Sequence, residues 1–268
     1  GDNVTNMSFA YMNCTNLTTA VCGPNVTTMS FAYENCHSLT TAVCGDNVTN
    51  MSFAYMNCTN LTTAVCGPNV TTMSTAYSDC TNLTTAVCGP NVTTMNYAYR
   101  NCHSLTTAVC GDNVTNMSNA YWGCRSLTTA VCGPNVTNMA YAYENCRNLT
   151  TAVCGPNVTN MAYAYSDCTN IQGNLYIYHN KTSNVACCFN NKISANRLNI
   201  YVHSGSNTLG RLRYTNIQSI VGKEITWTDD TATNGCHYNT AYNIYIYPVA
   251  NVEESRIANG DPDYMGNM

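Results

Sequence analysis

A 22-residue unit that recurs from residue 1 to residue 154 without one insertion constrains the fold of this chain more than any other feature. Seven complete copies follow one another, and an eighth begins at Gly155 and loses the pattern after Thr169. Exact repetition at such a period is typical of solenoids, in which each coil contacts only its neighbours. The repeat therefore takes precedence over the one or two compact domains that a length of 268 residues would suggest.

Some positions of the unit are constant between copies and others vary, which separates an inward set from an outward set. In the first copy the constant residues Met7, Ala10, Tyr11 and Cys14 are spaced i, i+3, i+4 and i+7, which predicts one face of a helix of about two turns. Two variable columns are predicted to point outward from this helical turn. The Phe9 column contains Phe9, Phe31, Phe53, Thr75, Tyr97, Asn119, Tyr141 and Tyr163, and the Met12 column contains Met12, Glu34, Met56, Ser78, Arg100, Trp122, Glu144 and Ser166.

Residues 17–22 fit the leucine-rich-repeat strand pattern Leu-x-x-Leu-x-Leu, with Ala20 and Cys22 in the second and third apolar places. The alternation of a strand then directs Ala20 and Cys22 inward and Val21 outward. The opposite register, with Val21 inside, stays open. Gly with Pro or Asp turns the chain after each strand. Asn3 and its equivalents are expected to hydrogen-bond the turn backbone and to stack as a ladder.

The run Asn-Val-Thr-x-Met followed by Ala-Tyr-x-x-Cys-x-x-Leu-Thr resembles the BspA-like leucine-rich repeats of bacterial surface proteins. The resemblance covers residues 1 to about 170 and departs from the family at Ala20 and Cys22, where Leu or Ile is usual. It implies an α/β fold. The expected form is a right-handed leucine-rich-repeat solenoid with short parallel β-strands on one face and short helical turns on the other, followed by irregular C-terminal coils and a cap.

After the regular repeats, short strand-like segments still recur at a similar spacing, but the residue pattern of the 22-residue unit is lost. Short alternating segments predict strands at residues 175–178, 198–202, 225–228 and 244–247. We interpret residues 171–250 as irregular repeats and a cap that continue the solenoid of residues 1–170, and residues 251–268 as a polar tail. A separate small β domain is the alternative.

Tyrosines alternate with the Leu and Ile residues of these segments, so they face outward if the aliphatic residues face the core. They are Tyr176, Tyr178, Tyr201, Tyr245 and Tyr247. Several rigid aromatic side chains on one sheet predict a binding surface for a protein or a glycan. Two alternatives stay open: the rings only close the sheet against other parts of the chain, or the Phe9 and Met12 columns bind the ligand.

The low charge of the chain excludes several classes of partner. Only 9% of the residues are charged and the net charge is −4. A basic stripe for nucleic acid and a Lys/Arg cluster for anionic lipid are both missing from the sequence. No apolar run reaches the ~18 residues of a membrane-spanning helix. The chain starts in phase with a repeat and without Met, which we interpret as a mature or excised portion of a longer protein.

Fifteen of the eighteen cysteines form two columns, headed by Cys14 and Cys22. Stacked coils bring column neighbours to about 4.8 Å, within reach of a disulfide. Parallel side chains cannot readily turn into the dihedral angle that a disulfide needs, so we predict mainly buried free thiols, with scattered disulfides as the alternative. The absence of any Cys-x-x-Cys pair predicts no zinc site.

Residues that could carry catalysis are scattered along the sequence. His37 and His103 share one column but are three coils apart, about 14 Å at the strand spacing. We therefore predict no catalytic residues, no metal and no cofactor. The function predicted is a non-enzymatic adhesion scaffold, extracellular or at the cell surface, that recognises a protein or glycan of a host or neighbouring cell. The alternative is a structural component of a phage tail or surface fibre in a virion.

Overall fold

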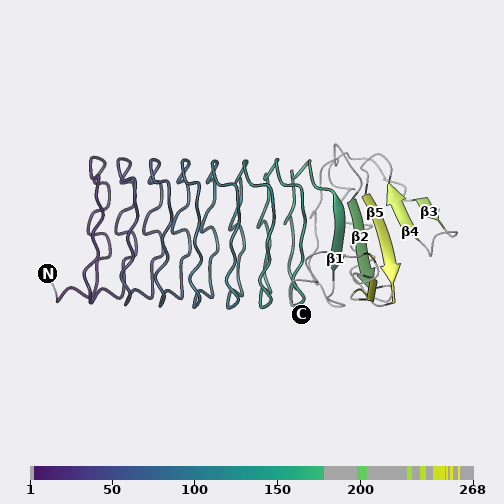
Figure 1. Ribbon diagram of the computed structural model, residues 1–268, viewed down its shortest axis with the longest axis horizontal. Coiled ribbons are helices and arrows are strands. Elements are labelled where there is room, and N and C mark those ends of the chain that lie inside the picture. Colours follow the sequence, from purple (N-terminus) through teal and green to yellow (C-terminus); the bar gives the residue numbers. More distant parts are fainter. Residues whose placement is uncertain are drawn as a thin grey trace.

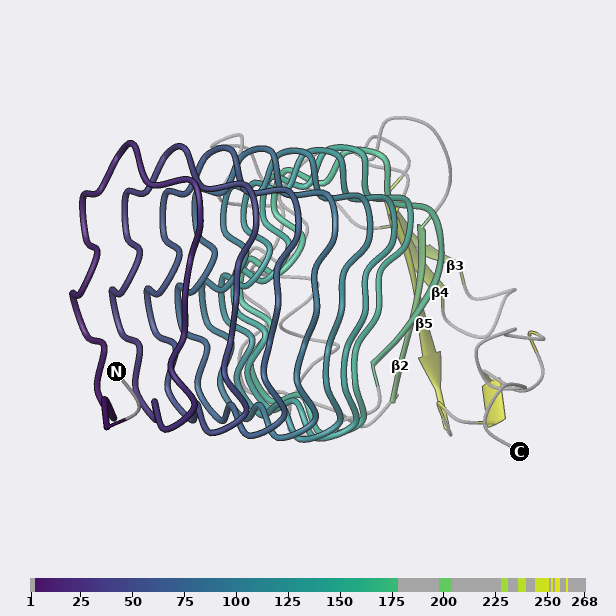
Figure 2. The same ribbon diagram turned by 60° about the vertical axis from the view of Figure 1, so that its left-hand side comes forward.

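The repeats form a solenoid. In the computed structural model the coils of residues 3–170 stack along the longest axis of the molecule, and a small sheet lies at the far end (Figure 1). Figure 2 shows the coils as similar loops that lie one behind another in register. The structure describes residues 3–177, 198–203, 228–230, 236–239, 244–250, 252, 254–255 and 259. Within these residues no helix has both the length and the apolar character needed to cross a bilayer.

Backbone bridges between residues 22 apart join each coil to the next. One series runs through the sixth position of the unit, from Asn6↔Thr28 to Asn138↔Asn160, and all its bridges are parallel. A second, shorter series includes Thr41↔Thr63 on the segment where the strands were predicted. The wall of the solenoid is therefore held by single parallel bridges rather than by continuous strands.

The helical turn predicted for residues 7–14 is wrong, because no residue between 3 and 177 is helical. The N–H groups alternate between two kinds of acceptor. Ala10 donates to the carbonyl of Met7 within its own coil at 3.0 Å, whereas Tyr11 donates to the carbonyl of Ala32 in the next coil at 2.8 Å. The segment is thus a run of tight turns in which every second N–H group binds the neighbouring coil.

Positive φ angles explain why these turns do not become a helix. Every member of the Phe9 column has φ between 55 and 62°, and the column headed by Asn13 is also in the left-handed region. A right-handed helix cannot continue through such residues. Tight turns of this kind still place side chains three and four residues apart on one side. The prediction that Met7, Ala10, Tyr11, Cys14 and their equivalents point inward is therefore correct, although the predicted helix is not.

The core is one continuous stack of the constant residues. In the second coil Met29, Ala32, Tyr33, Cys36 and Leu39 are completely buried, and the same positions are buried in the coils that follow. The Met12 column is not outward throughout, since Ser78 and Ser166 are buried. A serine side chain is too short to extend past longer neighbours in its column, which corrects the prediction for these two positions.

Buried tyrosines supply the hydrogen bonds that a strand would have made. The Tyr143 hydroxyl accepts the N–H of Val131 at 3.0 Å and donates to the carbonyl of the same valine at 2.5 Å. Equivalent tyrosines and valines are paired in the other coils, and the rings of successive tyrosines stack at 5.2 to 5.8 Å between centroids. Because the valine backbone is engaged in this way, the predicted strand is absent at residues 17–22 and is reduced to isolated bridges at the equivalent positions of later coils. The predicted register is confirmed, with Ala20 buried and Val21 53% exposed.

A five-stranded sheet follows the regular coils. It contains β1 (Gly173–Ile177), β2 (Leu198–His203), β3 (Thr228–Asp230), β4 (Cys236–Asn239) and β5 (Ile244–Val249), in the order β1-β2-β5-β4-β3. The β1-β2 and β2-β5 pairs are parallel, as predicted for strands that continue the solenoid, and the pairs that involve β4 are antiparallel. The backbone N–H of Gln172 donates to the carbonyl of Thr150 at 3.0 Å, which joins this sheet to the last regular coils. The predicted strand at residues 225–228 lies mostly outside the described residues, and β4 was not predicted.

The fifteen cysteines of the two columns form no disulfides and are present as thiols. The thiols of the Cys14 column donate to tyrosine carbonyls of the preceding coil, as Cys58 does to Tyr33 at 3.1 Å. Burial raises the pKa of Cys58 to about 12 and that of Cys44, in the other column, to about 11. Raised pKa values keep these groups as thiols at neutral pH, so they behave as small apolar core residues.

The Tyr143→Phe substitution is expected to lower the free energy of unfolding by about 2 kcal/mol, because it leaves a buried backbone N–H and C=O without a partner. The control is Tyr141→Phe, which makes the same change two residues away on a half-buried side chain. Denaturant melts measure both. Equal melts for the two variants would contradict the hydrogen-bonding role of the buried tyrosines.

Alkylation at pH 7 is expected to modify few thiols in the native protein, with the exposed Cys14 among the first. Unfolding without reductant should then make most of the eighteen thiols reactive. Mass spectrometry counts the alkylated groups. A protein whose cysteines stay unreactive after unfolding would contain disulfides, contrary to this expectation.

Candidate binding surfaces

The tyrosines predicted as a binding site come together in a stack, but not as an open surface. The register pairs Tyr176 with Tyr201 and Tyr201 with Tyr247, and the ring centroids are 5.0 and 5.1 Å apart. Tyr176 is only 5% exposed, and Tyr201 and Tyr247 are half-buried. The expectation that every one of these rings faces solvent is therefore wrong for Tyr176.

Leu175 and Ile177, on either side of Tyr176, are also buried. Both faces of β1 are thus covered at this point, and alternation along the strand cannot show which face is open. Tyr178 and the side chain of Tyr245 lie outside the described residues.

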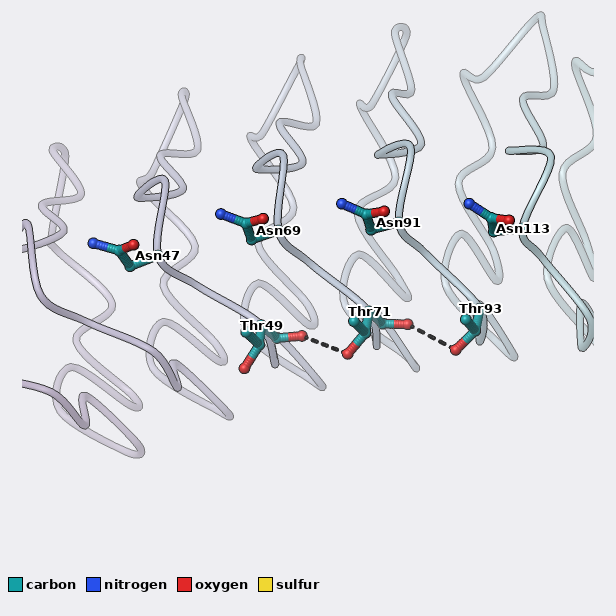
Figure 3. A pocket seen from close by; sticks show the side chains of 7 residues that line it. All are labelled: Asn47, Thr49, Asn69, Thr71, Asn91, Thr93 and Asn113. Atoms are coloured by element: carbon teal, nitrogen blue, oxygen red, sulfur yellow. Dashed lines mark hydrogen bonds between the residues drawn. The ribbon is translucent and has the colours of Figure 1, made fainter.

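The second surface is a shallow open groove between two polar columns (Figure 3). It is lined by Asn47, Thr49, Asn69, Thr71, Asn91, Thr93 and Asn113. Each asparagine amide donates to a carbonyl of the preceding coil, as Asn69 does to Asp46 at 2.8 Å. Each threonine hydroxyl does the same, as Thr71 does to Thr49 at 3.2 Å. The predicted asparagine ladder is confirmed, and its donors are used to hold the coils together.

The third surface is the Phe9 column, which runs along the turn side of the solenoid. Phe9 is 57% exposed and Tyr97 is 39% exposed. Where rings are adjacent they stack: Phe9 on Phe31 at 4.9 Å, Phe31 on Phe53 at 4.4 Å, and Tyr141 on Tyr163 at 4.7 Å. The interplanar angles of these pairs are 3 to 7°. This column is the most exposed aromatic surface in the described part of the chain.

The stacking direction decides what the Phe9 column offers to a ligand. Rings that stack along the solenoid axis cover each other's faces and present their edges to solvent. A sugar ring binds an aromatic residue through the face, whereas apolar side chains pack equally well against ring edges. Where its rings stack, the column therefore presents an apolar ribbon of ring edges.

Charged residues of the Met12 column form a chain of contacts beside the later part of this ribbon. Arg100 forms an ion pair with Asp79 at 3.7 Å, and its guanidinium lies 4.9 Å from the centre of the Trp122 ring. The indole Nε1 of Trp122 donates to Glu144 at 2.9 Å, and the hydroxyl of Ser166 donates to the same carboxylate at 3.5 Å. Asp79, Arg100 and Glu144 therefore each have a partner within the solenoid.

His37 and His103 are the two histidines of the regular coils. Nδ1 of His37 lies 3.0 Å from the carbonyl of Asn57 and so carries the proton of that hydrogen bond. Burial and the nearby Arg125 lower the pKa of His103. In the part of the chain that the structure describes, no three His, Cys, Asp or Glu side chains are grouped as metal ligands.

Stacked coils with this spacing of Val, Met, Ala, Tyr, Cys and Leu define a leucine-rich-repeat solenoid. The chain matches the model of the BspA type leucine rich repeat region over residues 3–96, 52–172 and 119–241, and it belongs to that family. Leucine-rich repeats are generally binding scaffolds whose stacked coils present an extended surface.

A search of the curated proteins gives no match. Among solved structures, a leucine-rich repeat protein from Bacteroides ovatus is similar over 85% of this chain and 82% of its own, at 12% identity and a TM-score of 0.44. A leucine rich cell surface protein from Faecalibacterium prausnitzii is similar over 65% of this chain, at 19% identity and a TM-score of 0.36. The chain spans 63% of the length of this second protein.

Positive φ in the Phe9 column is the feature that sequence reasoning missed. The column headed by Asn13, which also has positive φ, did contain a signal. It holds Asn, Asp or Gly in every copy, and these residues tolerate the left-handed region best. Asn119 is the one such residue in the Phe9 column itself. Thr75 is the opposite case, since a β-branched residue at φ 59° is strained.

The Thr75→Asn substitution is expected to raise the free energy of unfolding by about 1 kcal/mol, because asparagine tolerates the left-handed region. Thr72→Asn is the matched control, since it makes the same change in the same coil at a position without positive φ. Asn50 and Asn116 already occupy that column, so the control should be neutral. Equal effects of the two substitutions in denaturant melts would show that backbone strain at Thr75 is not relieved.

Proposed function

We propose that this chain is a non-enzymatic adhesion scaffold of the cell surface that binds a protein of a host or neighbouring cell through the Phe9 column. The observation that carries the proposal is the presence of Phe or Tyr at six of the eight positions of a column with positive φ. Large side chains in this conformation cost of order 1 kcal/mol or more each. Strain of this kind is typically kept where it serves a function.

Stacking energy alone does not account for these rings. Stacked pairs gain about 0.5–1.5 kcal/mol, which offsets part of the strain where two rings are adjacent. Tyr97 has Thr75 and Asn119 as its column neighbours, so it has no aromatic neighbour in its column, and it is 39% exposed. A tyrosine that is strained, exposed and unstacked is better explained by contact with a partner than by stability.

The surface favours a protein over a glycan. The stacked rings present edges, and methionines of the Met12 column lie beside them in the first and third coils. Methionine and aromatic side chains are common in the centre of protein interfaces. The leucine-rich-repeat family and the low charge of the chain support the same conclusion.

The test is a triple variant with Phe31→Asn, Tyr97→Asn and Tyr141→Asn, measured for adhesion to immobilised extracellular matrix proteins and to a glycan array. Asparagine suits the positive φ of these positions, so the variant should fold. We expect protein binding to fall at least tenfold. A control with Thr49→Asn, Thr71→Asn and Thr93→Asn in the polar groove should bind within about twofold of the parent.

Two results would contradict the proposal. Unchanged adhesion of the triple variant would show that another surface binds. Binding to glycans and to none of the proteins would show that the class of partner is wrong.

A further inference from the structure

Glu34 is an acidic residue in the middle of the most apolar part of the turn side. Its neighbours in the Met12 column are Met12 and Met56, and its own coil contributes Phe31. The register is fixed by the backbone, since the N–H of Asn13 donates to the carbonyl of Glu34 at 2.8 Å. The two methionines therefore lie on either side of Glu34, one coil away in each direction.

One carboxylate oxygen of Glu34 has no partner. Oε2 is buried and makes no hydrogen bond, the one such side-chain atom in the part of the chain that the structure describes. Burial raises the pKa of Glu34, and no positive group is among the causes. Arg100 is three coils away and already forms an ion pair with Asp79.

Glu144 occupies the same column position five coils further along and provides an internal comparison. Its two oxygens accept hydrogen bonds from Trp122 and Ser166, the residues one coil before and one coil after it. The backbone of the two coils is the same repeat, so the column can satisfy a glutamate when its neighbours are donors. At Glu34 the neighbours are methionines, which have no N–H or O–H group to donate.

An unsatisfied buried acceptor destabilises a protein, so its presence needs a reason. A cation from a partner would provide that reason, because Glu34 as a whole is only half-buried and its carboxylate can turn to form a strong and specific charge-assisted hydrogen bond. A single carboxylate does not make a calcium site, which needs about six to eight oxygen ligands. A lysine or arginine side chain of the partner could donate to the Glu34 carboxylate while its aliphatic part packs against the methionines and Phe31.

We infer that Glu34 is the anchor for a lysine or arginine of the partner, in a segment whose flanking residues are apolar and pack on Met12, Met56 and Phe31. The inference rests on the proposed function and specifies the chemistry of the partner. The carboxylate selects the cation and the surrounding apolar surface selects the flanking side chains. This site would favour a basic, apolar segment over an acidic or purely polar one.

The test uses an array of nine-residue peptides with apolar flanks, each present with Lys, Arg, Gln or Glu at the centre. We expect the labelled chain to bind the Lys and Arg versions at least tenfold more tightly than the Gln versions. Glu34→Gln should abolish this preference, whereas Glu144→Gln, the matched control, should keep it. Phe31→Asn should weaken binding of every peptide.

The outcomes separate the two proposals. Binding that depends on Phe31 but shows no preference for a cation, or a preference that survives Glu34→Gln, overturns the role of Glu34 and leaves the protein-binding surface intact. An array on which no peptide binds overturns both.

Thermal melts give a readout that needs no ligand. Glu34→Met should raise Tm by about 2–4 °C because it removes an unsatisfied buried oxygen, whereas Glu144→Met should lower Tm because it leaves Trp122 without its acceptor. A fall in Tm for Glu34→Met as large as that for Glu144→Met would show that Glu34 is a structural residue and would overturn the inference.

Discussion

The hydrogen bonds between each buried tyrosine hydroxyl and a valine backbone of the preceding coil determine how this solenoid is built. One hydroxyl serves both the N–H and the C=O of the valine, as Tyr143 does for Val131. This arrangement requires the ring to cross the core, and the small Ala20 and Cys22 positions leave room for it. The departure from Leu or Ile in this part of the repeat thus produces a core filled by tyrosine, and it explains why the strand side has isolated bridges instead of a sheet.

The turn side is held differently, and this has consequences for binding. Every second N–H group between residues 7 and 13 binds the neighbouring coil, so the turns are fixed to one another across the whole array. Positive φ in the Phe9 column then places each outward side chain in the same orientation, which is why adjacent rings are nearly parallel. A preordered apolar ribbon loses little conformational entropy when a partner binds to it.

Sequence alone predicted the parts of the fold that follow from the period. The 22-residue repeat predicted the solenoid and the inward columns, and the alternation of short segments predicted the strands β1, β2 and β5. It could not separate a helix from successive tight turns around Met7 and Cys14, because both place residues i, i+3, i+4 and i+7 on one side. The sequence correctly grouped the tyrosines of β1, β2 and β5 on one sheet. It could not predict the burial of Tyr176, because that burial depends on tertiary contacts and not on the alternation of residues along the strand.

The repeat makes side-chain differences unusually informative about function. Glu34 and Glu144 occupy equivalent positions on nearly the same backbone, so the unsatisfied oxygen of Glu34 cannot be attributed to backbone geometry. The neighbours of Glu34 in the column are Met12 and Met56, which have no group to donate, whereas Trp122 donates to Glu144 from the equivalent position. Apolar neighbours around an unpaired carboxylate lower stability when the chain is alone and favour a cationic side chain when a partner is present. This balance between stability and recognition is what a binding site requires, and the constant core of the solenoid is large enough to tolerate it.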